Sequence, residues 1–265
     1  MSGAILILAH AGDDGAALTA KWLRRELRPQ AVRFVRPEAL SLARWSHRVD
    51  ARGRASTRFA PPRAHPVASA DIGAVLNRIR HLPVPGFRRA TAKDQAYAAA
   101  ELQAVVASWL AELGDRVVHA MRHHPFVTPV LSLQRWATVA AACGLPVAAR
   151  SFATSARAAA ADQPLANADG SGHGRDGSAG ASSHCGGGTV LVAGEDADGL
   201  LAHRYGACAI RAARQLEFPL LEFRFAVQAN ETVLVEVDPL PPLTEPWGAA
   251  LAGRLLRSLA EQPPR

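Results

Sequence analysis

The sequence predicts an α/β fold built on a mostly parallel sheet. Short apolar runs typical of strands alternate with segments in which apolar residues recur every three or four positions. Such alternation favours strands that are joined by helices and therefore pair in parallel. The chain has 265 residues, 49% of them hydrophobic, so it can bury a full core as one large domain or two small ones.

The amino-terminal part is expected to begin with a strand, a turn and a helix. Residues 4–10, AILILAH, form a short apolar run that ends at a Gly/Asp turn. In the following DGAALTAKWLRREL, the residues at helical spacing are Ala17, Leu18, Trp22, Leu23 and Leu27. Two more strands are expected at AVRFVR and IGAVLNRI. Residues 44–69 are rich in Arg, Pro and His, and their pattern does not place individual strands and loops.

Two helices with clear ends follow. Residues 91–113 are predicted to form a helix because they carry one apolar stripe, made by Leu102, Val105, Val106, Trp109, Leu110 and Leu113. Thr91 and Asp94 resemble a capping box at its start. The second helix is expected to begin after Ser132 and to end near Gly144. On its apolar face, Cys143 is expected to be buried rather than nucleophilic.

The character of the chain changes between residues 156 and 188. This stretch is dominated by Ala, Gly, Ser and Asp and has no apolar period, which predicts a flexible linker. Ordered structure is expected again from TVLVAGE, followed by a helix at GACAIRAARQL. The segment FPLLEFRFAVQANETVLVEVDP alternates as a β-hairpin does, with Ala229 and Asn230 in the turn.

Composition and charge exclude several classes of protein. The formal net charge is +7, but the arginines are spread along the chain and only 6% of residues are aromatic, so no nucleic-acid partner is expected. No apolar run is long enough for a membrane span, and the first residues lack a signal-peptide pattern, which indicates a cytoplasmic protein. Cys143, Cys185 and Cys208 form no CxxC pair and are expected to be free thiols.

The histidines give no metal signal. Between the two helices stand His119, His123 and His124, and their spacing matches no established zinc-ligand pattern well. The sequence therefore predicts no zinc site there.

The strand TVLVEVDP carries the strongest functional signal. Glu236 and Asp238 are two positions apart, so they share one face of the strand, opposite to its valines. A three-residue hairpin loop would place Glu222 across from one of these two residues, depending on the register. Like charges directly across a sheet are unfavourable. A divalent cation would remove the repulsion, and so would an ion pair with Arg224; the residues leave both alternatives open.

Several motifs resemble those of ATP-grasp proteins. LVEVDPLPPL is similar to the carboxy-terminal motif of that family, in which a strand ending Glu-x-Asn-Pro supplies magnesium ligands, although Asp238 stands where the family usually has Asn. AVLNRI, ACGLPVAARSFATS and WGAALAGRLLRSLAE resemble other landmarks of ATP-grasp peptide maturases and ligases. The resemblance covers residues 1–155 and 189–260, and each motif is short.

The resemblance implies an ATP-grasp-like α/β fold in four parts. An amino-terminal α/β subdomain would span residues 1–90, and a helical and strand segment residues 91–155. The flexible linker, residues 156–188, would stand in place of the family's lid subdomain. A carboxy-terminal α+β part with the β-hairpin would span residues 189–265.

The same resemblance implies ATP and Mg²⁺ as cofactors and a set of site residues. The implied metal ligands are Glu222, Glu236 and Asp238. Aligning the aromatic residues instead puts Arg224 at the first ligand position, so that position stays open between the two; Arg224 is also the candidate phosphate-binding residue. Asn77 and Arg78, at the end of a strand, are candidate anchors for an anionic substrate, with a strand-end cap and a surface salt bridge as their alternative roles.

Two functions follow from these expectations. An active enzyme would use ATP to phosphorylate a carboxylate and pass the acyl phosphate to an amine, with basic side chains holding the nucleotide phosphates. ATP-grasp enzymes commonly use lysines for this, yet no lysine follows Lys93. We therefore expect a degenerate relative of peptide-modifying carboxylate–amine ligases, with weak or no ATP turnover. The alternative is a non-catalytic peptide-binding or scaffold module beside a complete enzyme. A peptide or protein substrate is the expected partner, and a homodimer is left open.

Overall fold

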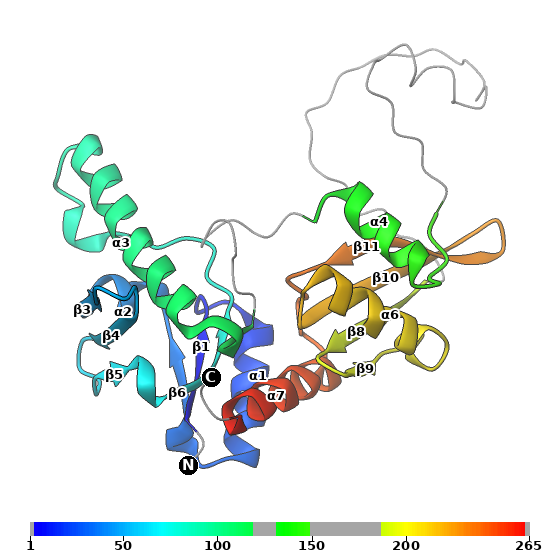
Figure 1. The fold of residues 1–265 in the computed structure, drawn as a ribbon, viewed down its shortest axis with the longest axis horizontal. Helices are drawn as coiled ribbons and strands as arrows, with labels where there is room; N and C mark the ends of the chain where they lie inside the picture. Colours follow the sequence, from blue (N-terminus) through cyan, green and yellow to red (C-terminus); the bar gives the residue numbers. More distant parts are fainter. Residues whose placement is uncertain (1–2, 119–130, 149–186, 263–265) are drawn as a thin grey trace, which may run out of the picture.

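The computed structural model describes residues 3–118, 131–148 and 187–262 of the chain. Figure 1 shows two sheets side by side, with helix α7 running between them. Three predictions fall outside the described residues: the histidines at positions 119, 123 and 124, the thiol of Cys185, and the flexible linker up to residue 186.

The first sheet is parallel throughout and has the strand order β2-β1-β6-β7. Its strands are β1 (Ala4–Leu8), β2 (Val32–Val35), β6 (Ile72–Asn77) and β7 (Val117–Val118). The helices of this part are α1 (Asp14–Glu26), α2 (Pro37–Ser41) and α3 (Ala92–Leu113). Short 3₁₀ turns cover Pro29–Ala31, Ser69–Asp71, Pro85–Phe87 and Gly114–Arg116. The predicted mostly parallel α/β sheet is thus confirmed for this half of the chain.

Helix α3 covers one face of the parallel sheet, as its apolar stripe predicts. Val106, Trp109, Leu110 and Leu113 are buried in one core cluster with Leu6 and Leu8 of β1. The Thr91 side chain accepts a hydrogen bond from the Asp94 N–H and donates its hydroxyl to the Asp94 carboxylate. The helix therefore begins where the capping residues predict.

Helix α1 packs through part of the predicted face, since Leu23 is buried and Trp22 and Leu27 pack against the same core cluster. Ala17 is exposed, and the buried residues are Gly15, Ala16, Thr19, Ala20 and Leu23. Gly15 is buried because the chain after β11 comes very close: a Cβ on Gly15 would lie 1.9 Å from the carbonyl oxygen of Pro242. Close backbone approach, which hydrophobic spacing does not report, therefore adds Gly15 to the buried face.

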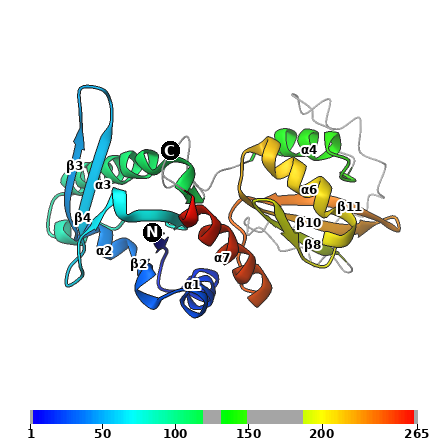
Figure 2. The same cartoon turned by 60° about the horizontal axis from the view of Figure 1, so that its bottom comes forward.

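Residues 44–69 form a small antiparallel sheet with the order β3-β4-β5. Its strands are β3 (Arg44–Val49), β4 (Ala55–Ala60) and β5 (Val67–Ala68). Trp45 and Phe59 stack on each other, and both meet Trp109 of α3 edge to face. In Figure 2 the β3–β4 hairpin projects beyond the helices around it.

The second sheet is antiparallel and has the order β11-β10-β8-β9. Its strands are β8 (Gly188–Ala193), β9 (Asp196–Asp198), β10 (Leu220–Gln228) and β11 (Glu231–Asp238). Helices α4 (Leu133–Ala142) and α6 (Ala202–Leu216) cover one face, where Cys143 is buried as predicted. Since Gly188 already belongs to β8, the predicted linker includes the first residue of this sheet.

Helix α7 (Pro246–Glu261) joins the two halves. It contacts α1, β1 and β6 on one side and β8 and β9 on the other. One core cluster consequently contains Ile5 and Ile7 of the parallel sheet together with Leu191 and Leu220 of the antiparallel sheet. None of the described helices is both long and apolar enough to cross a membrane.

Candidate functional site

The β10–β11 hairpin brings the predicted carboxylates together through a turn and a bulge. Ala229 and Asn230 form a two-residue turn, and both have positive φ, the geometry of a type I′ hairpin. The predicted turn at Ala229 and Asn230 is confirmed, whereas the three-residue length considered for the loop is wrong. From the turn the register runs to Phe225 opposite Leu234, and then shifts so that Arg224 lies opposite Glu236.

The shift decides which face the acidic residues occupy. Val235 is the additional residue of a β-bulge, so Glu222 lies opposite Asp238. Without it, the two-residue turn would place Glu222 opposite Val237, and the carboxylates of β11 would point to the buried face. The predicted common face of the valines is also corrected: Leu234 and Val237 are the buried residues, because the bulge changes the alternation.

The guanidinium of Arg224 lies at the centre of the cluster. Its Nε donates to Glu222 at 2.7 Å, one terminal nitrogen donates to Glu236 at 3.1 Å, and the other donates to Asp238 at 3.0 Å. The exposed side-chain fractions are 12% for Glu222, 23% for Asp238, 34% for Arg224 and 56% for Glu236. The cluster therefore grades from nearly buried at Glu222 to exposed at Glu236.

Burial and charge act in opposite directions on this cluster. Burial raises the pKa of Glu222 above its ordinary value, although the hydrogen bond and charge of Arg224 lower it. Burial lowers the pKa of Arg224, but the Glu222 hydrogen bond and the three carboxylate charges raise it further than burial lowers it. Arg224 therefore stays protonated and serves as the cation of the cluster.

The arrangement does not fit a magnesium ion in its observed form. Three carboxylates are the right kind of ligand for Mg²⁺. However, each one accepts from a different nitrogen of Arg224, so the guanidinium lies where a shared cation would have to lie. Within the described ranges, no three His, Cys, Asp or Glu side chains are grouped so that they could hold a metal ion. The assignment of Glu222, Glu236 and Asp238 as metal ligands stays a prediction that requires Arg224 to move.

The two candidate substrate anchors, Asn77 and Arg78, differ in what they contact. Asn77 is only 3% exposed; its Oδ1 accepts from the Ile79 N–H, and its Nδ2 is buried without a hydrogen-bond partner among the described residues. Arg78 is also buried, but its guanidinium donates to Asp13 at 2.7 Å and to the Pro241 carbonyl at 2.8 Å. The Nδ2 group of Asn77 is therefore available as a hydrogen-bond donor. Arg78 instead holds the end of β6 to Asp13 and to Pro241.

This connection joins the two candidate sites. Asp238 Oδ1 accepts from the Leu240 N–H at 2.8 Å, which turns the chain just after β11. The next residue, Pro241, presents its carbonyl to Arg78. Residues 239–242, the PLPP segment, therefore link the cluster around Arg224 to the end of β6. Arg78 and Pro241 are 163 residues apart in sequence.

Sequence reasoning missed the groups beside Asn77 and Arg78. The Asp13 carboxylate caps α1 by accepting from the Ala16 N–H, and it also pairs with Arg78. The His10 and His81 rings stack with centroids 4.5 Å apart, and burial together with His81 lowers the pKa of His10. A signal was present, because both histidines follow parallel strands at the carboxyl edge of a sheet, where α/β proteins bind ligands.

Comparison with known proteins identifies the fold. No protein-family model and no curated protein matches the sequence. Among solved structures, the macrocyclase MdnC of Microcystis aeruginosa MRC, bound with precursor peptide MdnA, has a TM-score of 0.67 at 11% identity, covering 95% of this chain and 99% of that one. The macrocyclase MdnB of the same organism has a TM-score of 0.60 at 13% identity, covering 96% and 99%.

A third solved structure of this fold is an ATP-grasp ligase. The RiPP-associated ATP-grasp ligase of Chryseobacterium gregarium, in complex with ADP and a leader and core peptide, has a TM-score of 0.66 at 12% identity. The match covers 98% of this chain and 96% of that one. Similar coverage with the ATP-grasp ligase PsnB, in complex with its precursor peptide and AMPPNP, supports the same conclusion.

Proposed function

Because the chain has the ATP-grasp fold over nearly its whole length, we propose that it is a peptide-binding ATP-grasp protein with weak or no ATP turnover. The observation that carries this proposal is the position of Arg224, which gives one N–H to each carboxylate of the family-like metal motif. A resident guanidinium in that place competes with Mg²⁺ for the same oxygens.

The geometry gives a physical reason for weak turnover. Phosphoryl transfer depends on metal ions that bridge phosphate oxygens and neutralise the developing charge. To bind a metal here, the protein would have to break three charge-assisted hydrogen bonds and hold Arg224 next to the incoming cation. The absence of lysine after Lys93 adds to this, since arginine would have to supply the positive charge for any further phosphate contact from the rest of the sequence.

A peptide is the proposed partner because solved relatives of the same fold carry one. MdnC is bound with a precursor peptide, and the Chryseobacterium gregarium ligase holds a leader and a core peptide. In this chain, Asn77 is a candidate contact for a peptide carboxylate or carbonyl, because its buried Nδ2 has no partner among the described residues.

An active carboxylate–amine ligase is the second candidate. One observation favours it: three carboxylates face one arginine, so the cluster keeps surplus negative charge, and Glu236 is its most exposed member. In that case Arg224 would have to turn away from the carboxylates, toward the nucleotide phosphates. Residues Glu222, Glu236 and Asp238 would then hold the metal, which would neutralise phosphate charge.

Nucleotide titration and turnover separate the two candidates. Purified protein is titrated with ATP and MgCl₂ in a calorimeter, and ADP release is measured alongside. We expect turnover far below the roughly 1 per second typical of slower enzymes. Turnover at or above that rate, lost in Glu236→Gln and retained in Glu195→Gln, would instead establish the ligase and overturn our proposal.

A further inference from the structure

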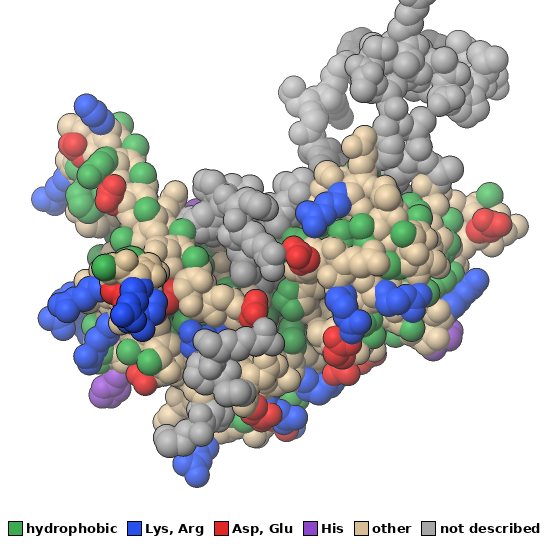
Figure 3. Space-filling model, in the orientation of Figure 1, with side chains coloured by type: hydrophobic (Ala, Val, Ile, Leu, Met, Phe, Trp, Pro, Cys, Tyr) green, Lys and Arg blue, Asp and Glu red, His purple; other side chains and the backbone are tan. Residues whose placement is uncertain are grey.

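A basic sheet surface on the small antiparallel sheet has no role in the function proposed above. The residues of β3 and β4 alternate between two faces, and the inner face packs against α3 through Trp45 and Phe59. The outer face carries the exposed arginines Arg44, Arg48 and Arg58, with Ser46 and Ser56 between them. Figure 3 shows blue side chains gathered over the part of the molecule where Figure 1 has β3 and β4.

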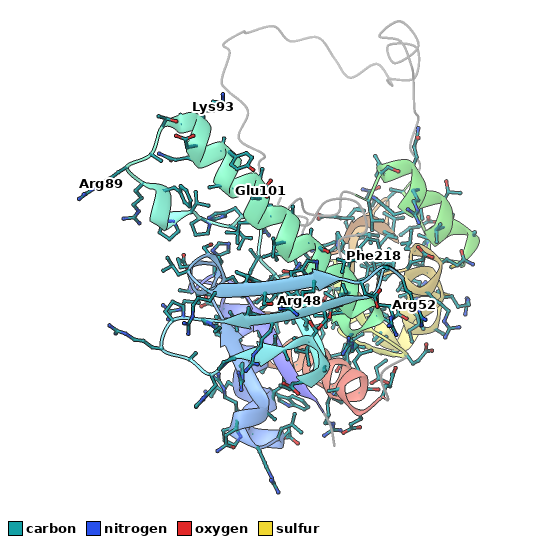
Figure 4. The ribbon with its side chains drawn as sticks, turned by 60° about the vertical axis from the view of Figure 1, so that its left-hand side comes forward. Arg48, Arg52, Arg89, Lys93, Glu101 and Phe218 are labelled. Atoms are coloured by element: carbon teal, nitrogen blue, oxygen red, sulfur yellow. The ribbon has the colours of Figure 1, made fainter. Side chains whose placement is uncertain are left out.

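The charge on this outer face is not compensated locally. None of residues 44–48 and 55–60 is acidic. In the described part of the chain, none of Arg44, Arg48 and Arg58 forms an ion pair. By contrast, Arg54 near the hairpin tip is paired with Asp50. Figure 4 shows Arg48 on this hairpin and Arg52 near its tip.

The inner contacts hold this surface firmly in place. The His47 ring lies between two hydroxyl groups, 2.6 Å from Thr57 Oγ1 and 2.9 Å from Ser108 Oγ of α3. Thr57 also donates to the Glu112 carboxylate of α3. The arginines on the other side of the hairpin are therefore presented by a sheet whose position is fixed.

The same sheet has a free edge beside this charge. β3 is an edge strand, and no described backbone group outside β4 bonds to it between residues 44 and 49. Because the Asp50 N–H donates to the Arg54 carbonyl and bonded residues alternate along an antiparallel pair, the backbone groups of Trp45, His47 and Val49 point to the free side. An extended chain could pair with them.

We propose that β3 binds an acidic, extended peptide segment as an additional strand of this sheet. In an added strand, alternate side chains lie on the basic face opposite Arg44, Ser46 and Arg48. Arg44 and Arg48 are about 13 Å apart along the strand, so acidic residues at every second position would meet both of them, and Arg58 lies within diagonal reach. The inference does not depend on nucleotide binding, because it rests on the edge and charge of this sheet alone.

Charged residues at a sheet edge also have a purely structural explanation, since they discourage edge-to-edge aggregation. Either sign of charge would serve that purpose. A group of arginines on one face, none of them in an ion pair, instead attracts a partner of negative charge and disfavours partners of positive charge. A peptide fits better than a nucleic acid because the arginines are arranged with the two-residue period of a strand, and the free backbone groups supply main-chain hydrogen bonds.

Binding of a fluorescent peptide of alternating Glu and Val, followed by anisotropy with the full chain, tests the proposal. Arg44→Glu/Arg48→Glu should weaken binding tenfold or more. The matched control Arg24→Glu/Arg25→Glu changes the same charge on exposed residues of α1 and should stay within twofold. Val49→Pro removes an outward N–H without changing charge and should weaken binding several-fold, whereas Val49→Thr should not.

Several outcomes would overturn the proposal. Equal losses in both double variants would mean that only net charge attracts the peptide. A peptide of the same composition with all Glu before all Val should bind more weakly; equal binding would contradict strand pairing. A single-stranded oligothymidine of equal charge that bound more tightly and lost affinity in Arg44→Glu/Arg48→Glu would assign the surface to nucleic acid. No binding of the Glu-Val peptide at millimolar concentration would show that the edge does not accept a strand.

Discussion

Arg78 donates from its Nε to the carboxylate of Asp13 at 2.7 Å, and both side chains are largely buried. Each partner has a second contact, since Asp13 caps α1 and Arg78 holds the Pro241 carbonyl. The pair therefore fixes the beginning of α1, the end of β6 and the segment after β11 against one another.

Replacing Arg78 with methionine is expected to lower the free energy of unfolding by about 3 kcal/mol, because Asp13 would remain buried without its cation. Urea denaturation measures the change. Arg54→Met breaks an exposed pair with Asp50 and is the control, with an expected loss below about 1 kcal/mol. If the two variants lost the same free energy of unfolding, the Arg78–Asp13 pair would contribute no more to stability than an exposed ion pair does.

Gly15→Ala is expected to loosen the PLPP segment, since the new Cβ would come within 1.9 Å of the Pro242 carbonyl oxygen. Backbone atoms must shift to relieve such a contact, so we expect a loss of about 2 kcal/mol or more. Gly12→Ala, three positions earlier, meets nothing within 4 Å and serves as the control in the same denaturation experiment. A stable Gly15→Ala variant would mean that this segment does not lie against α1 in solution.

Arg224→Met should leave three carboxylates without their shared cation and lower the thermal midpoint. Adding millimolar Mg²⁺ or Mn²⁺ should restore much of the loss, because a divalent ion would now have free access to the carboxylate oxygens. The wild-type midpoint should respond little. Arg214→Met, which breaks an exposed pair with Glu195, should show neither effect. A wild-type midpoint that rose as much as the variant's would show that Arg224 does not block the metal.

Glu222 gives the cluster a defined pH dependence. Since burial raises its pKa above 4.5, the folded state holds this proton more tightly than the unfolded state does. The stability that it contributes is therefore present at acidic pH and is lost as pH rises from about 4.5 through the higher pKa of the folded protein. The wild type should lose stability relative to Glu222→Gln over this range in urea titrations. The opposite slope would show that the charge of Arg224 outweighs burial.

Periodicity in the sequence predicted the elements whose own residues decide their form. The long stripe of α3 and the apolar runs of β1 and β6 needed no knowledge of their partners. The small sheet could not be placed in this way, because β3 and β4 alternate arginine and serine with Trp, His, Thr and Phe rather than with a plain apolar pattern. Only the presence of Trp109 from α3 explains why their inner face is buried.

The candidate site was predictable in its members but not in its arrangement. Alternation along the strand placed Glu236 and Asp238 on one face, and both do contact the same guanidinium. Whether these carboxylates face Arg224 and Glu222 depends on the register with β10, which a one-residue bulge decides. The contact from Arg78 to Pro241 joins residues so distant in sequence that no local pattern could reveal it.

The bulge at Val235 also determines which changes of length the hairpin can accept. A single deletion between the turn and Glu236 can be absorbed if β11 straightens, because Arg224 would still lie opposite Glu236 and Glu222 opposite Asp238. A single insertion at the same place cannot be compensated by straightening the strand. It would turn both acidic residues of β11 toward the core unless a second irregularity formed. Relatives that keep this charge cluster should therefore differ from this chain by losses rather than gains of one residue in the hairpin.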